Sequence, residues 1–143
     1  MLKRILFSAL CLSASIGMSA EAPLWLRNVS ISPSGKQIAF TYQGDIYVVA
    51  AAGGEARQLT SNPAYDTAPV WSPDETKIAF SSDREGPLDI SVMEAKGGAP
   101  KRLTTKSSRK TPLAFRDNGH ILYATSDMPI MESRMRGFGD QVY

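Results

Sequence analysis

Apolar and polar residues alternate along short segments of this chain, and tight turns separate the segments. Residues 28–32 read Asn-Val-Ser-Ile-Ser, and segments 37–42 and 45–50 are rich in β-branched and aromatic residues. Gly53 and Gly54 then allow positive φ at a tight connection, ahead of a short segment at 57–60. Alternation with a period of two is typical of β-strands, so residues 28–60 are predicted to form four short antiparallel strands.

The same pattern returns further along the chain. Residues 31–40 contain Ile-Ser-Pro and Ile-Ala-Phe, which return forty residues later at 71–80 as Trp-Ser-Pro and Ile-Ala-Phe. Residues 45–60 return forty-four residues later at 89–104, with the same Asp-Ile, Gly-Gly and Leu-Thr pairs. A third copy begins at Leu113-Ala114-Phe115 and then loses the pattern. Four short strands in about 40–45 residues are typical of one blade of a β-propeller.

We therefore predict an all-β fold: a partial β-propeller with about two complete four-stranded blades and part of a third. The predicted boundaries are 1–20 for a signal peptide and 21–143 for the propeller, whose blades span about 29–61, 69–105 and 112–143. A closed ring uses about 4–8 blades. Three explanations stay open: a fragment of a longer protein, a subunit that completes a ring by oligomerising, or an open stack of sheets. The first is preferred, and the unpaired outer strands of such a segment are expected to cause self-association.

One turn residue differs between the two clear copies. Gly35 supplies the flexible corner of the first Ser-Pro turn, whereas Glu75 takes this place in the second. The sequence allows two interpretations, a turn that does not need positive φ there or a turn with mild strain.

The first twenty residues match a secretory signal. Lys3 and Arg4 precede the mostly apolar run 5–16, and Met18-Ser19-Ala20 offers a small-residue exit after which cleavage is expected. The apolar run is shorter than the roughly 20 residues of a spanning helix, so no stable membrane anchor is expected. Cys11, the single cysteine, lies inside this run, and Leu10 before it does not fit a lipid-anchor signal.

Loss of this signal changes the charge of the chain. The full sequence has 16 Lys and Arg against 14 Asp and Glu. Without Lys3 and Arg4 the two counts are equal, at 14 each. A neutral chain gives no support for a nucleic-acid partner, and a chain without cysteine is expected to depend on its core for stability.

The repeats resemble a known group, the TolB-type propeller blades, which carry an S-P-D-G turn, an I-A-F strand, an S-D-R corner and a G-G-x-x-x-x-L-T ending. This chain has Ser72-Pro73-Asp74, Ile78-Ala79-Phe80, Ser82-Asp83-Arg84, and Gly97-Gly98 through Leu103-Thr104. Residues 23–27, Pro-Leu-Trp-Leu-Arg, and residues 44–47, Gly-Asp-Ile-Tyr, resemble more narrowly the start of bacterial tricorn-type serine peptidases.

The tricorn-type resemblance implies a function that this segment serves only as part of a larger protein. It implies a non-catalytic propeller of an exported bacterial peptidase, periplasmic or extracellular, that gates or binds peptide substrates. Its implied partners are the remainder of the propeller, a PDZ module, a peptidase domain, or other copies of the chain. The alternative is a TolB-like periplasmic protein-binding propeller without enzymatic activity. Since the family's nucleophile has no matching position here, whether the chain belongs to an enzyme stays open.

No catalytic, cofactor-binding or metal-binding residue is assigned from the sequence. His120, the single histidine, follows Asn118-Gly119 in an expected hairpin turn, and no Gly-x-Ser-x-Gly elbow exists to face it. We therefore interpret His120 as a solvated turn residue. Asn28-Val29-Ser30 fits a glycosylation acceptor but is discounted, since it opens a strand and the signal looks bacterial.

Four carboxylates are candidates for a calcium site: Asp66, Asp74, Asp83 and Asp89. Their spacing fits no EF-hand loop, so turn capping and pairing with Arg84 are preferred. The Asp83-Arg84 corner is expected to hold a strand connection through bonds from side chain to backbone.

Two further groups of residues, one basic and one aromatic, could in principle bind a ligand. The basic residues of segment 101–110 are interpreted as a flexible solvated connection rather than an anion site: Lys101, Arg102, Lys106, Arg109 and Lys110. Large aromatic residues at matching repeat positions are interpreted mostly as core rather than recognition residues: Trp25, Trp71, Phe40, Phe80, Phe115 and Tyr123.

Overall fold

The computed structural model describes residues 25–105, 108–126 and 131–134 of the chain. Within these ranges it contains eleven β-strands and no helix, so no helix there is long and apolar enough to cross a membrane. The strands are β1 (Arg27–Ile31), β2 (Gln37–Tyr42), β3 (Asp45–Ala50), β4 (Arg57–Gln58), β5 (Asp66–Trp71), β6 (Lys77–Ser82), β7 (Asp89–Glu94), β8 (Lys101–Arg102), β9 (Lys110–Asp117), β10 (His120–Thr125) and β11 (Met131–Arg134).

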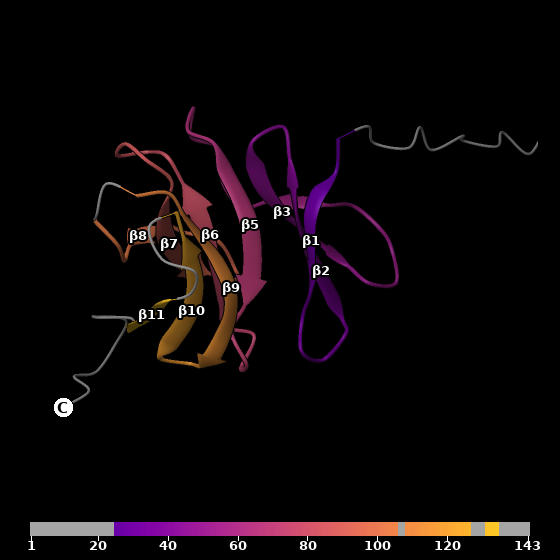
Figure 1. The fold of residues 1–143 in the computed structure, drawn as a ribbon. Helices are drawn as coiled ribbons and strands as arrows, with labels where there is room; N and C mark the ends of the chain where they lie inside the picture. Colours follow the sequence, from indigo (N-terminus) through magenta and orange to yellow (C-terminus); the bar gives the residue numbers. More distant parts are fainter. Residues whose placement is uncertain (1–24, 106–107, 127–130, 135–143) are drawn as a thin grey trace, which may run out of the picture.

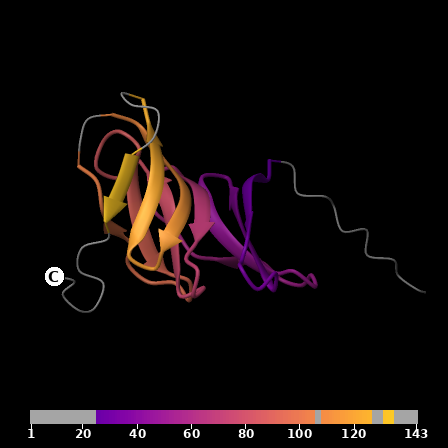
Figure 2. The same ribbon diagram turned by 60° about the horizontal axis from the view of Figure 1, so that its bottom comes forward.

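The strands form three antiparallel sheets in chain order. The first sheet is β1-β2-β3-β4, the second is β5-β6-β7-β8, and the third is β9-β10-β11. The sheets stack face to face, and their leading strands β1, β5 and β9 lie side by side (Figures 1 and 2). This is the arrangement of propeller blades around an axis, with β1, β5 and β9 innermost. The predicted all-β partial propeller is confirmed.

Strand register shows which residues are equivalent in the three sheets. Ile31 pairs with Ile38 in the first sheet, Trp71 with Ile78 in the second, and Phe115 with Ile121 in the third. The next pairs follow in step: Ser30 with Ala39, Val70 with Ala79, and Ala114 with Leu122. Each innermost strand then has a bulge, so the repeat extends to an irregularity of the backbone.

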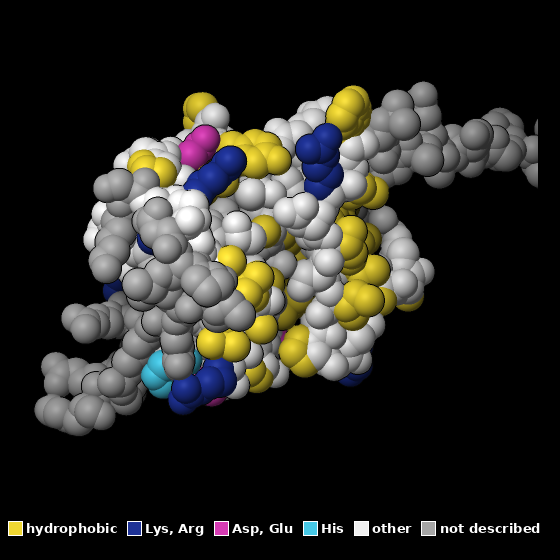
Figure 3. Space-filling model, viewed as in Figure 1, with side chains coloured by type: hydrophobic (Ala, Val, Ile, Leu, Met, Phe, Trp, Pro, Cys, Tyr) yellow, Lys and Arg dark blue, Asp and Glu magenta, His cyan; other side chains and the backbone are white. Residues whose placement is uncertain are grey.

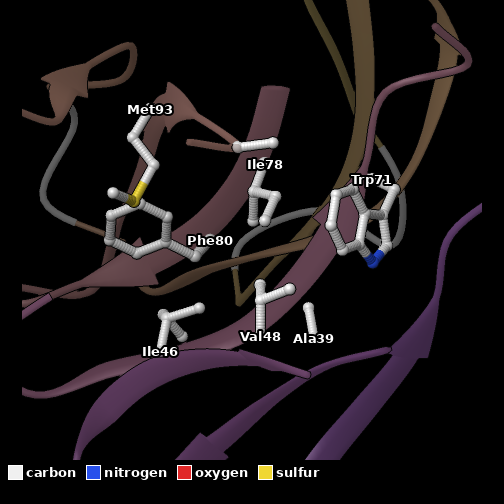
Figure 4. Packing of buried hydrophobic residues seen from close by; sticks show 8 residues of the cluster. Ala39, Ile46, Val48, Trp71, Ile78, Phe80 and Met93 are labelled. Carbon is white, nitrogen blue, oxygen red and sulfur yellow. The ribbon is translucent and has the colours of Figure 1, made fainter. Parts of the chain in front are cut away.

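The largest core cluster fills the space between the first and second sheets. Ala39, Ile46 and Val48 of the first sheet face side chains of the second, which Figure 4 shows in close contact: Trp71, Ile78, Phe80 and Met93. Phe80, Ile46, Ile78 and Met93 are completely buried. Their burial supplies much of the hydrophobic stabilisation of the stack.

A second cluster joins the second and third sheets. Ala79, Ile90 and Val92 of the second sheet meet Ile121 and Tyr123 of the third. The second sheet is therefore covered on both faces, which explains why β6 and β7 are buried along nearly their whole length.

The first sheet is covered on one face only by the described residues. Phe40 pairs with Tyr47, and the two rings stack at 5.7 Å between centroids on the face away from the second sheet. Phe40 is therefore half-buried, whereas the equivalent Phe80 is fully buried. The expectation of core aromatics holds for Trp71, Phe80 and Tyr123.

Phe115 is half-buried but packs against the second core cluster, as expected. Trp25 departs from the expectation: it is 69% exposed, with the guanidinium of Arg27 over its ring at 5.4 Å. Trp25 precedes β1 and has no sheet against it, so its ring packs on a neighbouring cation rather than in a core.

The Ser-Pro turns are alike in the first two sheets. Ser32 N–H donates to the Gln37 carbonyl at 2.9 Å, and Ser72 N–H donates to the Lys77 carbonyl at 2.9 Å. Glu75 has a φ of 59°, close to the 72° of Gly35. The second turn thus keeps positive φ without a glycine. Of the two interpretations, mild strain is therefore the one that the structure supports.

Several predictions fall on parts of the chain outside the described residues. These are the signal peptide at 1–20 with Cys11, residue Lys106, and the end of the third predicted blade.

Candidate functional site

The innermost strands of the three sheets together form one surface. A single pocket is lined by three residues at equivalent positions: Ile31, Trp71 and Phe115. The residue before each of them also lines the pocket: Ser30, Val70 and Ala114. We call this the axial pocket, and its volume is about 360 Å³. A repeat of one position in three strands therefore builds one concave site.

The axial pocket is apolar. Its remaining lining residues are Pro33, Pro73 and Leu113, so Ser30 contributes the one hydroxyl and no charged side chain takes part. Leu113 is 48% exposed, which makes it an unusually open large apolar residue. In Figure 3 hydrophobic side chains gather over β5 and β9, while the charged side chains visible there lie toward the top and bottom of the face.

Hydrogen bonds between sheets fix the walls of the axial pocket. The indole N–H of Trp71 donates to the carbonyl of Ser30 at 3.1 Å, which locks the ring of the second sheet to the first strand. Below the pocket, Asn118 Oδ1 of the third sheet accepts a hydrogen bond from the backbone N–H of Asp74 at 3.2 Å. The three strands are therefore held in fixed relative positions.

An aspartate and a threonine close each of the first two sheets in the same way. Thr60 Oγ1 donates to Asp45 Oδ1 at 2.9 Å and accepts from Ile46 N–H at 2.9 Å. Thr104 Oγ1 donates to Asp89 Oδ1 at 2.8 Å and accepts from Ile90 N–H at 3.0 Å. The Asp-Ile and Leu-Thr pairs of the repeat thus have a structural role in joining the third and fourth strands.

Asp89 also anchors the basic segment that follows it. The buried Lys110 places Nζ 2.8 Å from Asp89 Oδ1, and Arg102 binds Asp89 Oδ2 and, at 2.6 Å, Glu85. Burial raises the pKa of Asp89, but the hydrogen bonds from Lys110, Thr104 and Arg102 outweigh it and hold the pKa below its usual value.

The interpretation of residues 101–110 as a solvated connection is therefore wrong at two positions. Lys110 is 2% exposed and Arg102 is partly buried, because both bind the buried carboxylate of Asp89, Arg102 from the same sheet and Lys110 from the next one. Lys101 and Arg109 are exposed as expected.

The two residues of the Asp83-Arg84 corner bind different partners. Asp83 Oδ1 accepts the backbone N–H of Tyr65 at 2.7 Å, which is the expected bond from side chain to backbone. Arg84 pairs with the fully buried Asp66 at 2.5 Å. The preferred structural roles of these two carboxylates thus match the contacts.

Some polar atoms near this corner lack a hydrogen-bond partner among the described residues. These buried atoms are Thr41 Oγ1, Asp66 Oδ1, Ser82 Oγ and Arg84 Nε. A second pocket of about 250 Å³ lies beside them, lined by Thr60, Asn62, Arg84 and Pro100 among others. It is more polar than the axial pocket.

Of the other candidate side chains, Asp74 lies in a turn, whereas His120 is the half-buried first residue of β10 and not a solvated turn residue. Asp74 caps the second Ser-Pro turn: burial raises its pKa, but hydrogen bonds from Ser72 and Thr76 outweigh this effect and lower it. His120 Nδ1 lies 2.8 Å from Asp117 Oδ1, and this hydrogen bond lowers the pKa of Asp117. Among the described residues, no three His, Cys, Asp or Glu gather as a metal site.

The residues that line the axial pocket were not singled out as a site from the sequence. Trp71 and Phe115 were interpreted as possible core residues, and Leu113 was used only to mark a repeat. An alignment of the three repeats could have indicated the pocket. It places an apolar residue at the equivalent position of each innermost strand: 31, 71 and 115.

Comparison with known proteins identifies the same architecture. The chain is 36% identical over 102 residues to Tricorn protease homolog 1 of Streptomyces coelicolor, a match that covers 71% of the chain and 9% of that protein. It is 33% identical over 78 residues to a TolB homolog of Chlorobium luteolum, covering 54% of the chain and 17% of that protein. The chain thus spans a small part of the curated relatives it matches.

A solved structure shows the fold directly. The crystal structure of TolB from Acinetobacter baumannii has a TM-score of 0.64 and 20% identity, covering 80% of the chain and 33% of that protein. Residues 23–139 match the family described as the tricorn protease N-terminal beta propeller domain. The repeats, the stacked sheets and this match together lead to one assignment: the chain belongs to the tricorn N-terminal β-propeller family.

Proposed function

We propose that the chain is the non-catalytic N-terminal propeller segment of an exported tricorn-like serine peptidase, and that it gates or binds peptide substrates there. The observation that carries the proposal is the axial pocket, a concave apolar site on the strands that surround the propeller axis. Concave apolar sites with few polar groups are typical of ligand binding. The family match supplies the peptidase context.

The proposal includes the larger assembly. The described residues form three sheets, fewer than the roughly 4–8 blades of a closed ring, so the proposed working unit has further blades. The match to the tricorn relatives supports adding a peptidase domain to it. The three blades are proposed to span about 29–61, 69–105 and 112–143. Residues 1–20 are proposed to direct export to the periplasm or beyond.

The experiment that tests the peptidase context is to read the genomic sequence past codon 143 and to assay the whole product. We expect coding sequence for a peptidase domain and hydrolysis of peptides by the whole protein. Absence of such a domain in any frame would remove the peptidase part of the proposal. Export is tested separately, by N-terminal sequencing of the protein from a periplasmic fraction, with Glu21 expected as the first residue.

A TolB-like protein-binding propeller is the second candidate. The observation in its favour is the identity of 33% to a TolB homolog over 78 residues. This candidate predicts that the whole protein captures a protein partner but hydrolyses no peptide, so the same assay separates the two.

A further inference from the structure

The apolar lining of the axial pocket indicates which kind of peptide would bind there. Resting on the function proposed above, we propose that the axial pocket receives the apolar side chain of an extended peptide segment and rejects a charged one. The ligand class is thus peptides with a leucine-like or phenylalanine-like residue at the position that enters the pocket.

The absence of charge in the lining decides this selectivity. Eight of the nine lining residues are apolar, and Ser30 is the exception. A charged side chain that entered would lose water without gaining a partner of opposite charge, which is strongly unfavourable. An apolar side chain of the same size would gain contact with Leu113 and the indole of Trp71 and would release water.

Trp71 presents only its apolar surface to this ligand. Its one polar group, the indole N–H, is already bound to the Ser30 carbonyl at 3.1 Å. The indole is therefore fixed in place and offers the ligand no donor. A fixed aromatic wall is a low-entropy surface for an incoming side chain.

The size of the axial pocket fits the side chains of a peptide. A volume of about 360 Å³ is at the small end of the roughly 300–1,000 Å³ range of ligand pockets. That space suits one or two side chains of a peptide.

The edges of the innermost strands favour insertion of a side chain over addition of a strand. Pro69 lies in β5 and Pro112 lies in β9, and neither has a backbone N–H to offer. Strand addition depends on such main-chain bonds. The peptide is therefore held chiefly through the side chain in the pocket.

The test uses the full chain with Trp25→Phe, so that Trp71 is the single tryptophan. The probes are pentapeptides blocked at both ends that differ only at the central residue: Leu, Phe, Asp or Lys. We expect saturable binding of the Leu and Phe peptides in calorimetry, with a saturable change in the intensity of Trp71 emission. The Asp and Lys peptides should bind at least about tenfold more weakly.

A matched pair of variants locates the binding. Leu113→Asp places a charge in the axial pocket and should weaken the Leu peptide by about tenfold or more. Val29→Asp is the control, because Val29 precedes Ser30 as Leu113 precedes Ala114, is 61% exposed, and does not line the pocket. It should leave binding unchanged. Circular dichroism melts establish that both variants fold.

Three results would overturn the inference. Equal binding of the Asp and Leu peptides would refute the apolar class while leaving the proposed gating function in place. Failure of every peptide to bind, or binding insensitive to Leu113→Asp, would refute the pocket as the site. If Leu113→Asp instead abolishes self-association in sedimentation and no peptide binds, the pocket is a contact between copies. The peptidase context is judged independently, by the assay of the whole protein.

Discussion

Ser34 of the first sheet donates its hydroxyl to Glu75 Oε2 of the second sheet at 3.0 Å, and its backbone N–H donates to the other carboxylate oxygen. The two residues lie in equivalent Ser-Pro turns. Glu75 adopts a φ of 59° to reach this position, which costs an ordinary residue about 1 kcal/mol. A strained backbone and a bond between sheets are therefore combined in one residue.

This combination gives the first prediction. Ser34→Ala should lower the free energy of unfolding by about 0.5–1.5 kcal/mol. The same change should cost clearly less in a Glu75→Gly background, where the bond to Glu75 is already lost and Ser34 Oγ keeps only its contacts with Ser32 Oγ and the Lys36 N–H. Urea unfolding of the two single variants and the double variant measures this coupling. An equal cost of Ser34→Ala in both backgrounds would contradict it.

The second prediction concerns the buried pair of Lys110 and Asp89. Lys110→Met removes one of the two cations that bind the buried Asp89 carboxylate and leaves Arg102 in place, so stability should fall by about 1.5–3 kcal/mol. Lys101→Met, at an exposed position of the same basic segment, should change it by less than about 0.5 kcal/mol. Thermal and urea unfolding provide the comparison. Similar effects of the two variants would refute the structural role of Lys110.

The third prediction, on how stability depends on pH, follows from the lowered pKa of Asp89. Its folded-state pKa is lowered, so its contribution is fully present above the unfolded carboxyl pKa of about 3.9 and is lost as pH falls through the folded value. The free energy of unfolding should therefore decline more steeply with acidification in the parent chain than in Asp89→Asn. Urea titrations between about pH 6 and pH 3 test this slope. Parallel curves would exclude Asp89 as a contributor.

The fourth prediction compares two equivalent phenylalanines. Phe80→Ala empties a fully buried site between the first two sheets and should cost about 3–5 kcal/mol. Phe40→Ala changes the same position of the first sheet, where the ring is half-buried and stacked on Tyr47, so the cost should be clearly smaller. Chemical denaturation measures both. A cost of Phe40→Ala as large as that of Phe80→Ala would show that another surface covers the first sheet.

The open face of the first sheet gives the last prediction. The isolated chain should self-associate in sedimentation velocity, because this face has the same apolar pattern that the second sheet buries. Phe40→Lys should weaken the association, and Thr111→Lys, at an exposed position on β9, should not. A monodisperse monomer of the parent chain at all concentrations would refute the prediction.

Much of the fold could be predicted because the repeat is local. The motifs of residues 31–40 and 71–80 contain their own turn signals and strand pattern, so neighbouring residues alone identify the strands. The same reasoning placed the Gly-Gly connections, where Gly53 and Gly97 have φ values of 93° and 97°.

Contacts between sheets were beyond this reasoning. Lys110 looks solvated in sequence because basic residues surround it, and only the burial of Asp89 in the preceding sheet brings it inside. Phe40 and Phe80 look equivalent in sequence, and only the number of neighbouring sheets distinguishes them. The axial pocket depends on three strands that are far apart in the chain, so its volume could not be inferred before the strands were placed.

The first residues of β5 and β9 make the same backbone contact but carry opposite charges. Asp66 N–H donates to the Gly44 carbonyl and Lys110 N–H to the Leu88 carbonyl, each bonding the residue before the aspartate of the preceding sheet. Asp66 is neutralised by Arg84 of its own sheet, whereas Lys110 itself neutralises Asp89 of the preceding sheet. The two junctions therefore share one backbone geometry but neutralise their buried carboxylates with cations from different strands and turns, so their charges cannot be exchanged one residue at a time.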